Sequence, residues 1–132
     1  MPLPSRELAR LTWTRAALDD PGAILERASA DASFRSYWRT QSGGQTWIVM
    51  DAPPDREDIR PWLDIAQRLN GVGLHAPQIR AADADAGFVL MSDLGGRLYL
   101  PELNERSAGA LYGDALSALL AMQTRIDSSD LP

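Results

Sequence analysis

The clearest structural signal lies in Ser33–Asp51, SFRSYWRTQSGGQTWIVMD, where two strand patterns stand on either side of a turn. Side chains of different character alternate over Ser33–Thr40, with the two-residue period of a strand. Gln45–Asp51 is rich in β-branched and aromatic residues, which favour strands. Gln41–Gly44 supplies the glycines that a tight turn uses. The stretch therefore predicts a β-hairpin.

On the amino-terminal side of this hairpin, the sequence predicts one helix and one strand. Ser5 is a suitable N-cap for a helix that reaches Leu18, and Asp19–Gly22 ends it with residues that favour turns. Trp13 is predicted to lie off the apolar stripe of this helix. The residues expected near one face are Leu8, Leu11 and Leu18. Ala23–Ser29 begins with an apolar pair and is predicted to form a strand.

On the carboxy-terminal side, Ala52–Pro54 ends the second strand, because proline donates no hydrogen bond to a sheet. A helix is predicted over Pro61–Asn70, with proline in its first turn. Its inward residues are expected to be Trp62, Ile65, Ala66 and Leu69. Two further strands, Gln78–Asp83 and Phe88–Met91, flank a turn at Ala84–Gly87 and predict a second hairpin.

The last predicted element is a long helix over Ser107–Ile126, after a break at Gly95–Gly96 and before the polar tail Asp127–Pro132. Its apolar residues recur at steps of three and four, namely Leu111, Ala115, Ala118, Leu119, Met122 and Ile126. The complete order indicates an α+β fold with a five-stranded, mostly antiparallel sheet and a helix packed on it. The same order of elements is typical of the small lobe of a protein-kinase-like fold.

Composition excludes several kinds of site. The chain has 132 residues, 45% hydrophobic and 23% charged, as expected of one globular domain. It contains no cysteine and one histidine, which excludes disulfides, cysteine nucleophiles and metal sites built from several histidines. All 13 lysine and arginine residues are arginine, so the chain has no lysine for a Schiff base or a P-loop. A net charge of −5 with dispersed arginines argues against a nucleic-acid partner.

The first residues also argue against a signal peptide or a membrane span, because charges interrupt every apolar run. The charged residues concerned are Arg6, Glu7, Arg10, Arg15, Asp19 and Asp20. A cytoplasmic protein with no membrane partner is therefore expected.

Four runs carry a family resemblance: ADASFRSYWRT (Ala30–Thr40), WIVMDAPP (Trp47–Pro54), EDIRPWLDIAQRL (Glu57–Leu69) and GFVLMSDLG (Gly87–Gly95). Together they resemble the aminoglycoside-phosphotransferase-type kinases. Within that superfamily they are most similar to the bacterial cell-wall-recycling kinases, which phosphorylate N-acetylmuramate and N-acetylglucosamine at the anomeric hydroxyl with ATP. The resemblance implies that residues 1–93 form the amino-terminal lobe. It also implies that residues 94–132 form the hinge and the first helix of a carboxy-terminal lobe whose remainder is absent.

This resemblance implies a two-part nucleotide site. The loop over the phosphates would be Ala30, Asp31, Ala32, Ser33, Phe34 and Arg35. The adenine pocket and hinge would be Ile48, Met50, Met91, Ser92, Asp93 and Leu94. ATP and Mg²⁺ are the implied cofactors of the complete enzyme, and the amino sugar would bind mainly to the absent lobe. Alternatives stay open: the glycine-free loop as an ordinary turn, Ile48 and Met91 as core, and Asp93 as a turn carboxylate.

The sequence departs from the kinase pattern at the third strand, where Met50 occupies the position of the usual lysine. Arg35 or Arg39 could replace that lysine, Mg²⁺ and the absent lobe could supply the charge, or both arginines could form a solvated strand face. The helix from Pro61 has no glutamate to complete the usual ion pair. The catalytic HxDxxxxN-like run and the later metal-binding aspartate motif do not occur, so no catalytic or metal-binding residue is assigned.

Two functional hypotheses follow from these observations. The first is the ATP-binding lobe of an amino-sugar kinase, inactive without its partner lobe. The second is a stand-alone protein-interaction module with the same small-lobe fold. In either case some self-association through the last helix is expected, because its apolar stripe would be uncovered, notably at Leu111, Leu119 and Met122.

Overall fold

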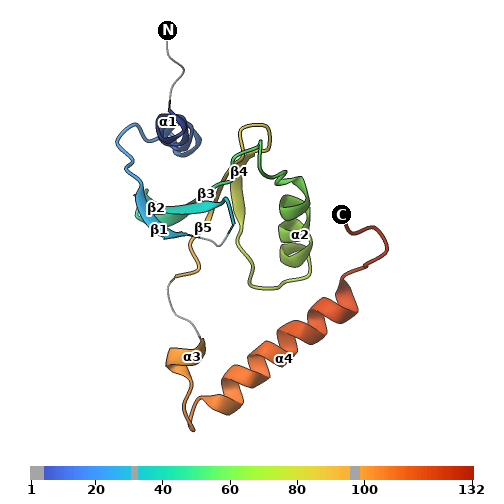
Figure 1. Cartoon of the computed structure of the whole chain (residues 1–132). Helices are drawn as coiled ribbons and strands as arrows, with labels where there is room; N and C mark the ends of the chain where they lie inside the picture. Colours follow the sequence, from blue (N-terminus) through green and yellow to red (C-terminus); the bar gives the residue numbers. More distant parts are fainter. Residues whose placement is uncertain (1–4, 31–32, 96–98) are drawn as a thin grey trace.

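The computed structural model describes residues 5–30, 33–95 and 99–132, and Figure 1 shows a sheet with helices on either side of it. In chain order the elements are α1 (Arg6–Leu18), β1 (Glu26–Ala30), β2 (Ser36–Ser42), β3 (Gln45–Asp51), α2 (Arg60–Gly71), β4 (Ile79–Asp83), β5 (Phe88–Ser92), α3 (Tyr99–Glu102) and α4 (Ala108–Arg125). The strands lie in the order β1-β2-β3-β5-β4, and each neighbouring pair is antiparallel. This arrangement confirms the predicted α+β small-lobe fold.

The central hairpin agrees closely with its prediction. β3 has the predicted bounds, whereas β2 begins at Ser36 rather than Ser33. Its start is delayed because the Ser33 hydroxyl accepts a hydrogen bond from the Arg35 amide at 3.3 Å, which holds a turn in place of a strand. β1 likewise begins at Glu26 rather than Ala23. The short helix α3 was not predicted from the sequence.

One side of the sheet is covered by α1, and we call it the α1 face. Its buried core residues are Leu18, Ala23, Val49 and Leu90, with Trp13, Trp38 and Trp47 packed around them. The expected stripe of α1 is wrong in part: Leu8 is 53% exposed, and Trp13 stacks against Phe88 with ring centroids 5.5 Å apart. The helix buries Arg10 and Thr14 together with Leu18 instead.

Asp51 explains why a charged residue of α1 turns inward. Its carboxylate is almost fully buried at the end of β3 and accepts hydrogen bonds from two arginines of α1. Arg6 donates from Nε at 2.9 Å and from Nη2 at 2.7 Å, and Arg10 donates from Nη1 at 2.7 Å. The Arg10 guanidinium also lies 3.8 Å from the centre of the Trp38 ring. Since a buried carboxylate needs charged partners, this cluster fixes α1 on the sheet.

The opposite side of the sheet is covered in part by α2, and we call it the α2 face. Its buried core residues are Met50, Ala52, Ile59, Val89 and Met91, with Trp62 and Leu63 of α2 packed against them. Ala66 is buried as expected, but the expected inward position of Ile65 is wrong, because this side chain is 43% exposed. Ile65 lies beside α4 instead and lines a pocket with Leu69, Met122 and Ile126.

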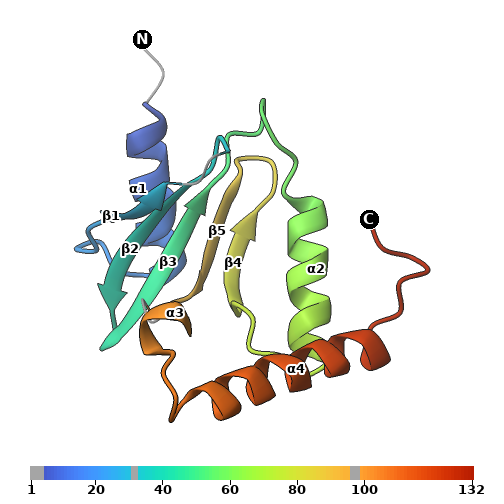
Figure 2. The same ribbon diagram turned by 60° about the horizontal axis from the view of Figure 1, so that its bottom comes forward.

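α4 runs across the end of α2 and away from the sheet (Figures 1 and 2). It has the predicted apolar periodicity, yet it has no buried residue. Two arginines tie its carboxy-terminal end to α2: Arg125 donates to the Val72 carbonyl at 3.1 Å, and Arg68 donates to Asp130 at 2.8 Å. Leu116, Leu119 and Leu120 of α4 are exposed, whereas Leu111 is half-buried. Within the described ranges, no helix combines the length and apolarity needed to cross a membrane.

Candidate functional site

Three of the predicted pocket residues share the α2 face. Ile48 and Met50 lie two residues apart on β3, so their side chains are on the same face of the sheet. Met91 of β5 is the direct cross-strand partner of Ile48. Ile48 is half-buried, so it offers apolar surface, and Met91 lies next to it. Met50 is 0% exposed and packs within the core around Ile59. Ile48 and Met91 thus form an apolar strip in which Ile48 supplies the exposed surface, because Met91 is only 4% exposed and is a core residue like Met50.

The predicted hinge continues directly from this strip. Ser92 ends β5, and its hydroxyl accepts a hydrogen bond from the Gln78 amide at 2.9 Å, which ties the hinge to the start of β4. The Asp93 carboxylate accepts from Arg39 Nε at 2.8 Å and from the Gly95 amide at 2.8 Å. Leu94, beside it, is exposed. Asp93 therefore stabilises a turn and links the hinge to β2.

The Asp93–Arg39 contact changes the protonation behaviour of both groups. The hydrogen bond from Arg39 lowers the pKa of Asp93 below its usual value, and the Gly95 amide acts in the same direction. The same hydrogen bond raises the pKa of Arg39. Both side chains are therefore charged at neutral pH, and the positive charge of Arg39 is already directed at the hinge.

The predicted phosphate loop is described in part. Ala30 ends β1, whereas Asp31 and Ala32 lie outside the described residues. Phe34 is exposed, and the Arg56 guanidinium lies 4.8 Å from the centre of its ring. This contact joins the loop to the turn that precedes α2.

Arg35 makes a second and stronger contact with the same turn. Its Nε donates to Glu57 Oε2 at 2.7 Å, and its Nη2 donates to Glu57 Oε1. The hydrogen bond that Arg35 donates to Glu57 is the main reason why the pKa of Arg35 rises above its ordinary range. Glu57 was not predicted as a partner, because the kinase pattern places such a glutamate on the helix, whereas Glu57 lies before α2. Residues this far apart in sequence give no local signal of pairing.

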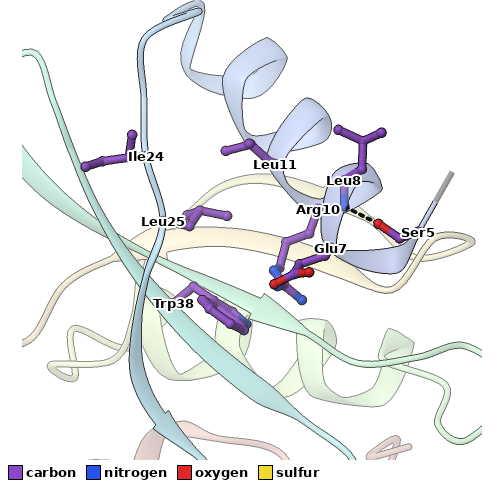
Figure 3. Close-up of a pocket in the computed structure, with 8 residues that line it drawn as sticks. All are labelled: Ser5, Glu7, Leu8, Arg10, Leu11, Ile24, Leu25 and Trp38. Carbon is purple, nitrogen blue, oxygen red and sulfur yellow. Dashed lines mark hydrogen bonds between the residues drawn. The ribbon is translucent and has the colours of Figure 1, made fainter.

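A separate pocket of about 450 Å³ lies between α1 and the segment that leads into β1. Figure 3 shows Leu8 and Leu11 of the helix facing Ile24 and Leu25 of that segment, with Arg10 extending toward Trp38. Because its walls belong to the α1 face, this pocket lies on the other side of the sheet from Ile48 and Met91. It is therefore not part of the predicted nucleotide site.

Metal ligands are a further requirement of the chemistry that the resemblance implies. Among residues 5–30, 33–95 and 99–132, no three or more histidine, aspartate or glutamate side chains are grouped so that they could hold a metal ion.

Known proteins match this chain over most of its length. Residues 24–130 match the phosphotransferase enzyme family (APH). The N-acetylmuramate/N-acetylglucosamine kinase of Pseudomonas aeruginosa is 50% identical over 103 residues, which cover 78% of this chain and 30% of that protein. The kinase of the same name from Pseudomonas putida is 42% identical over 112 residues, covering 85% of this chain and 33% of that protein. The corresponding kinase of Neisseria meningitidis is 33% identical, covering 96% and 39%.

The chain thus spans about a third of the length of these curated relatives. The match covers both hairpins, α2 and all of α4, and it confirms the resemblance carried by the four sequence runs. On this ground, the chain belongs to the phosphotransferase enzyme family.

Proposed function

We propose that this chain is the ATP-binding amino-terminal lobe of a cytoplasmic kinase that phosphorylates N-acetylmuramate and N-acetylglucosamine at the anomeric hydroxyl. The observation that carries the proposal is the α2 face, where an apolar strip at Ile48 and Met91 lies between a hinge at Asp93 and a charged loop at Arg35. The relatives named for this activity support it, because their identity to the chain reaches 50%.

The proposed site divides the nucleotide into three parts. The adenine ring would lie against Ile48 and Met91, with its polar edge toward the backbone of the hinge at Ser92–Leu94. The phosphates would lie under the loop Ala30–Arg35, where backbone amides and a guanidinium attract anions. Residues 1–93 would form this lobe, and residues 94–132 would lead through the hinge to the first helix of a second lobe.

The same proposal expects no phosphate transfer by residues 1–132 alone. Phosphoryl transfer requires a base that orients the attacking hydroxyl and metal ions held against the phosphates. No metal-binding group of side chains occurs in the described part of the chain. The amino sugar and the Mg²⁺ would therefore be bound mainly by residues outside this chain.

A chimeric protein tests the proposal directly. Residues 1–132 are joined to the part of the Pseudomonas aeruginosa relative that follows the matched region, and both this protein and the isolated chain are titrated with ATP by calorimetry. The isolated chain should bind ATP weakly, because half of the cleft is missing, and should make no sugar phosphate. The chimera should bind ATP more tightly and form sugar 1-phosphate from N-acetylglucosamine.

Two variants show whether the α2 face is responsible. Ile48→Glu places a charge in the apolar strip and should abolish ATP binding by the chimera, whereas Leu8→Glu, at an exposed position of α1, should leave binding unchanged. Circular dichroism shows whether each variant is folded. A folded Ile48→Glu variant that binds ATP normally would contradict the proposed site. Sugar phosphate made by residues 1–132 alone would contradict the proposed inactivity.

The exposed face of α4 supports a second, compatible proposal. Leu116, Leu119 and Leu120 are exposed on a helix without buried residues. Apolar side chains gathered in this way mark a surface that another protein part covers. We propose that the isolated chain self-associates through α4, and that in a longer protein the second lobe covers this surface.

A further inference from the structure

The proposed nucleotide site lacks the lysine that usually contacts the phosphates of ATP in kinases. Kinases hold the phosphates of ATP with a lysine of the third strand. Here that position is Met50, which is fully buried, and the chain contains no lysine. A fixed positive charge within this lobe would therefore come from another residue of the same face.

Arg35 lies at the place where such a charge is needed. Tyr37 of β2 is the cross-strand partner of Met50, and Ser36 is the partner of Asp51. Arg35 is the last residue of the loop and lies two residues before Tyr37, so it stands just before the start of β2, near the row that contains Met50. Its side chain is 20% exposed, which leaves part of the guanidinium open to a ligand.

Glu57 holds this guanidinium in one orientation. The two-point contact uses Nε and Nη2, and a paired fork of this kind restricts both position and rotation. The Phe34–Arg56 contact joins the same two segments a second time. The loop and the turn before α2 therefore form one supported unit, in which Arg35 is prepositioned.

Four other arginines of the described chain lie away from the phosphate loop. Arg39, the other candidate, is held by Asp93 at the hinge, where the adenine rather than the phosphates would lie. Arg6 and Arg10 lie on the α1 face with Asp51. Arg60 is paired with Asp58 and Asp85 on the exposed surface.

We propose that Arg35 contacts the phosphates of the nucleotide in place of the missing lysine, and that Glu57 is the positioning residue that holds it. This inference rests on the proposed function. Arginine and glutamate thus reproduce the lysine–glutamate pair of kinases with different residues at different positions: the cation comes from the start of β2 and the carboxylate from the turn before α2.

The test uses the chimera described above, with four variants. Arg35→Ala removes the cation, Arg35→Lys keeps one positive charge without the planar fork, and Glu57→Gln keeps the shape of the positioning residue without its charge. Arg60→Ala is the matched control, because it removes an exposed arginine that lies close in sequence to Glu57. The measured quantities are kcat, the KM values for ATP and for the sugar, and the inhibition constants of ADP and adenosine.

Arg35→Ala should raise the KM for ATP and the inhibition constant of ADP by about ten- to hundredfold, as expected when a charged hydrogen bond to phosphate is lost. The inhibition constant of adenosine and the KM for the sugar should stay unchanged, because neither ligand carries the phosphates. Arg35→Lys should recover part of the loss, and Glu57→Gln should weaken ATP binding by a smaller factor. Arg60→Ala should behave as the unsubstituted protein.

Two results would overturn the inference while the proposed function stands. One is an unchanged KM for ATP in Arg35→Ala. The other is an equal increase in the inhibition constants of ADP and adenosine, which would indicate a structural role. If Arg35→Ala fails to fold, Arg35→Lys and Glu57→Gln provide the test instead, because the inhibition constant of ADP should still rise relative to that of adenosine. An unsubstituted chimera that does not bind ATP would instead overturn the proposed function itself.

Discussion

The two faces of the sheet use charge in opposite ways. On the α1 face, Asp51 is buried together with Arg10, and each of its oxygens has an arginine partner. On the α2 face, the pairs Arg35–Glu57 and Arg39–Asp93 lie at the ends of an apolar strip, and each keeps some contact with solvent. Buried ion pairs hold elements together, whereas partly exposed charges beside a half-buried apolar side chain remain able to meet a ligand. We therefore propose that the first face serves stability and the second serves binding.

The largest expected effect comes from the α1 face. Asp51→Asn should lower the free energy of unfolding by about 3 kcal/mol, because Arg10 would stay buried without its counter-charge. Urea unfolding followed by circular dichroism measures this change. Asp85→Asn is the control: its side chain is 93% exposed where it pairs with Arg60, and a solvent-exposed pair of this kind contributes little to stability. If both variants lose the same free energy of unfolding, the distinction between the two faces would be wrong.

Gly87 lies in the turn between β4 and β5, where the backbone passes close to Ala52. Its φ is +79°, and a Cβ there would stand 1.9 Å from the Ala52 carbonyl oxygen. Gly87→Ala should destabilise the fold by about 2 to 3 kcal/mol, because backbone strain and a clash combine. Gly43→Ala is the matched control, with φ of +63° and no atom within 4 Å, so it should show only the cost of the backbone conformation. Thermal unfolding of both variants measures the difference, and a Gly43→Ala variant that loses as much as Gly87→Ala would contradict it.

α4 provides a third apolar surface that neither face covers. Leu119→Gln should weaken self-association of the isolated chain by about tenfold, since burial of a leucine side chain contributes about 1.5 to 3 kcal/mol. Light scattering over a range of concentrations measures the mass. The control is Leu8→Gln, an exposed leucine on α1. A strictly monomeric chain at high concentration would show that α4 is not a self-association surface.

The smallest expected effect is the pH dependence of the hinge pair. The folded-state pKa of Asp93 is lowered, so its pairing with Arg39 stabilises the fold above the ordinary carboxyl pKa and is lost as pH falls through the lowered value. Asp93→Asn should therefore be less stable than the unsubstituted protein by about 0.5 kcal/mol at pH 7, because Arg39 is partly exposed. This difference should shrink as pH falls below the ordinary carboxyl pKa and disappear once pH is below the lowered pKa of Asp93. A difference that persists at low pH would show that the pair is not its origin.

Local signals predicted the elements well, because the residues that set them lie close in sequence. β-Branched residues at Gln45–Asp51 gave the correct bounds of β3, Ser5 caps α1 by accepting from the Leu8 amide at 3.1 Å, and Pro61 lies in the first turn of α2. The interior of α1 was misjudged because its burial depends on Asp51, a partner far along the chain. Apolar periodicity alone predicts that leucine rather than arginine faces the sheet.

The candidate site was predictable in the same uneven way. Strand alternation and the family resemblance placed Ile48 and Met91 together, and β3–β5 pairing brings them into direct register. The Arg35–Glu57 pair was not predictable, because only the folded chain brings the start of β2 to the turn before α2. The periodic apolar residues of α4 predicted a helix with an uncovered stripe, and Leu119 and Met122 are exposed as expected, whereas Leu111 is half-buried.

The unequal sharing of tryptophans between the faces has an optical consequence. Trp13, Trp38 and Trp47 pack on the α1 face, whereas Trp62 packs on the α2 face. In a variant that keeps only Trp62, intrinsic fluorescence would come from the side of the sheet proposed to bind nucleotide. A variant that lacks only Trp62 would emit from the side held by Asp51. The protein thus carries separate spectroscopic reporters for ligand binding and for detachment of α1.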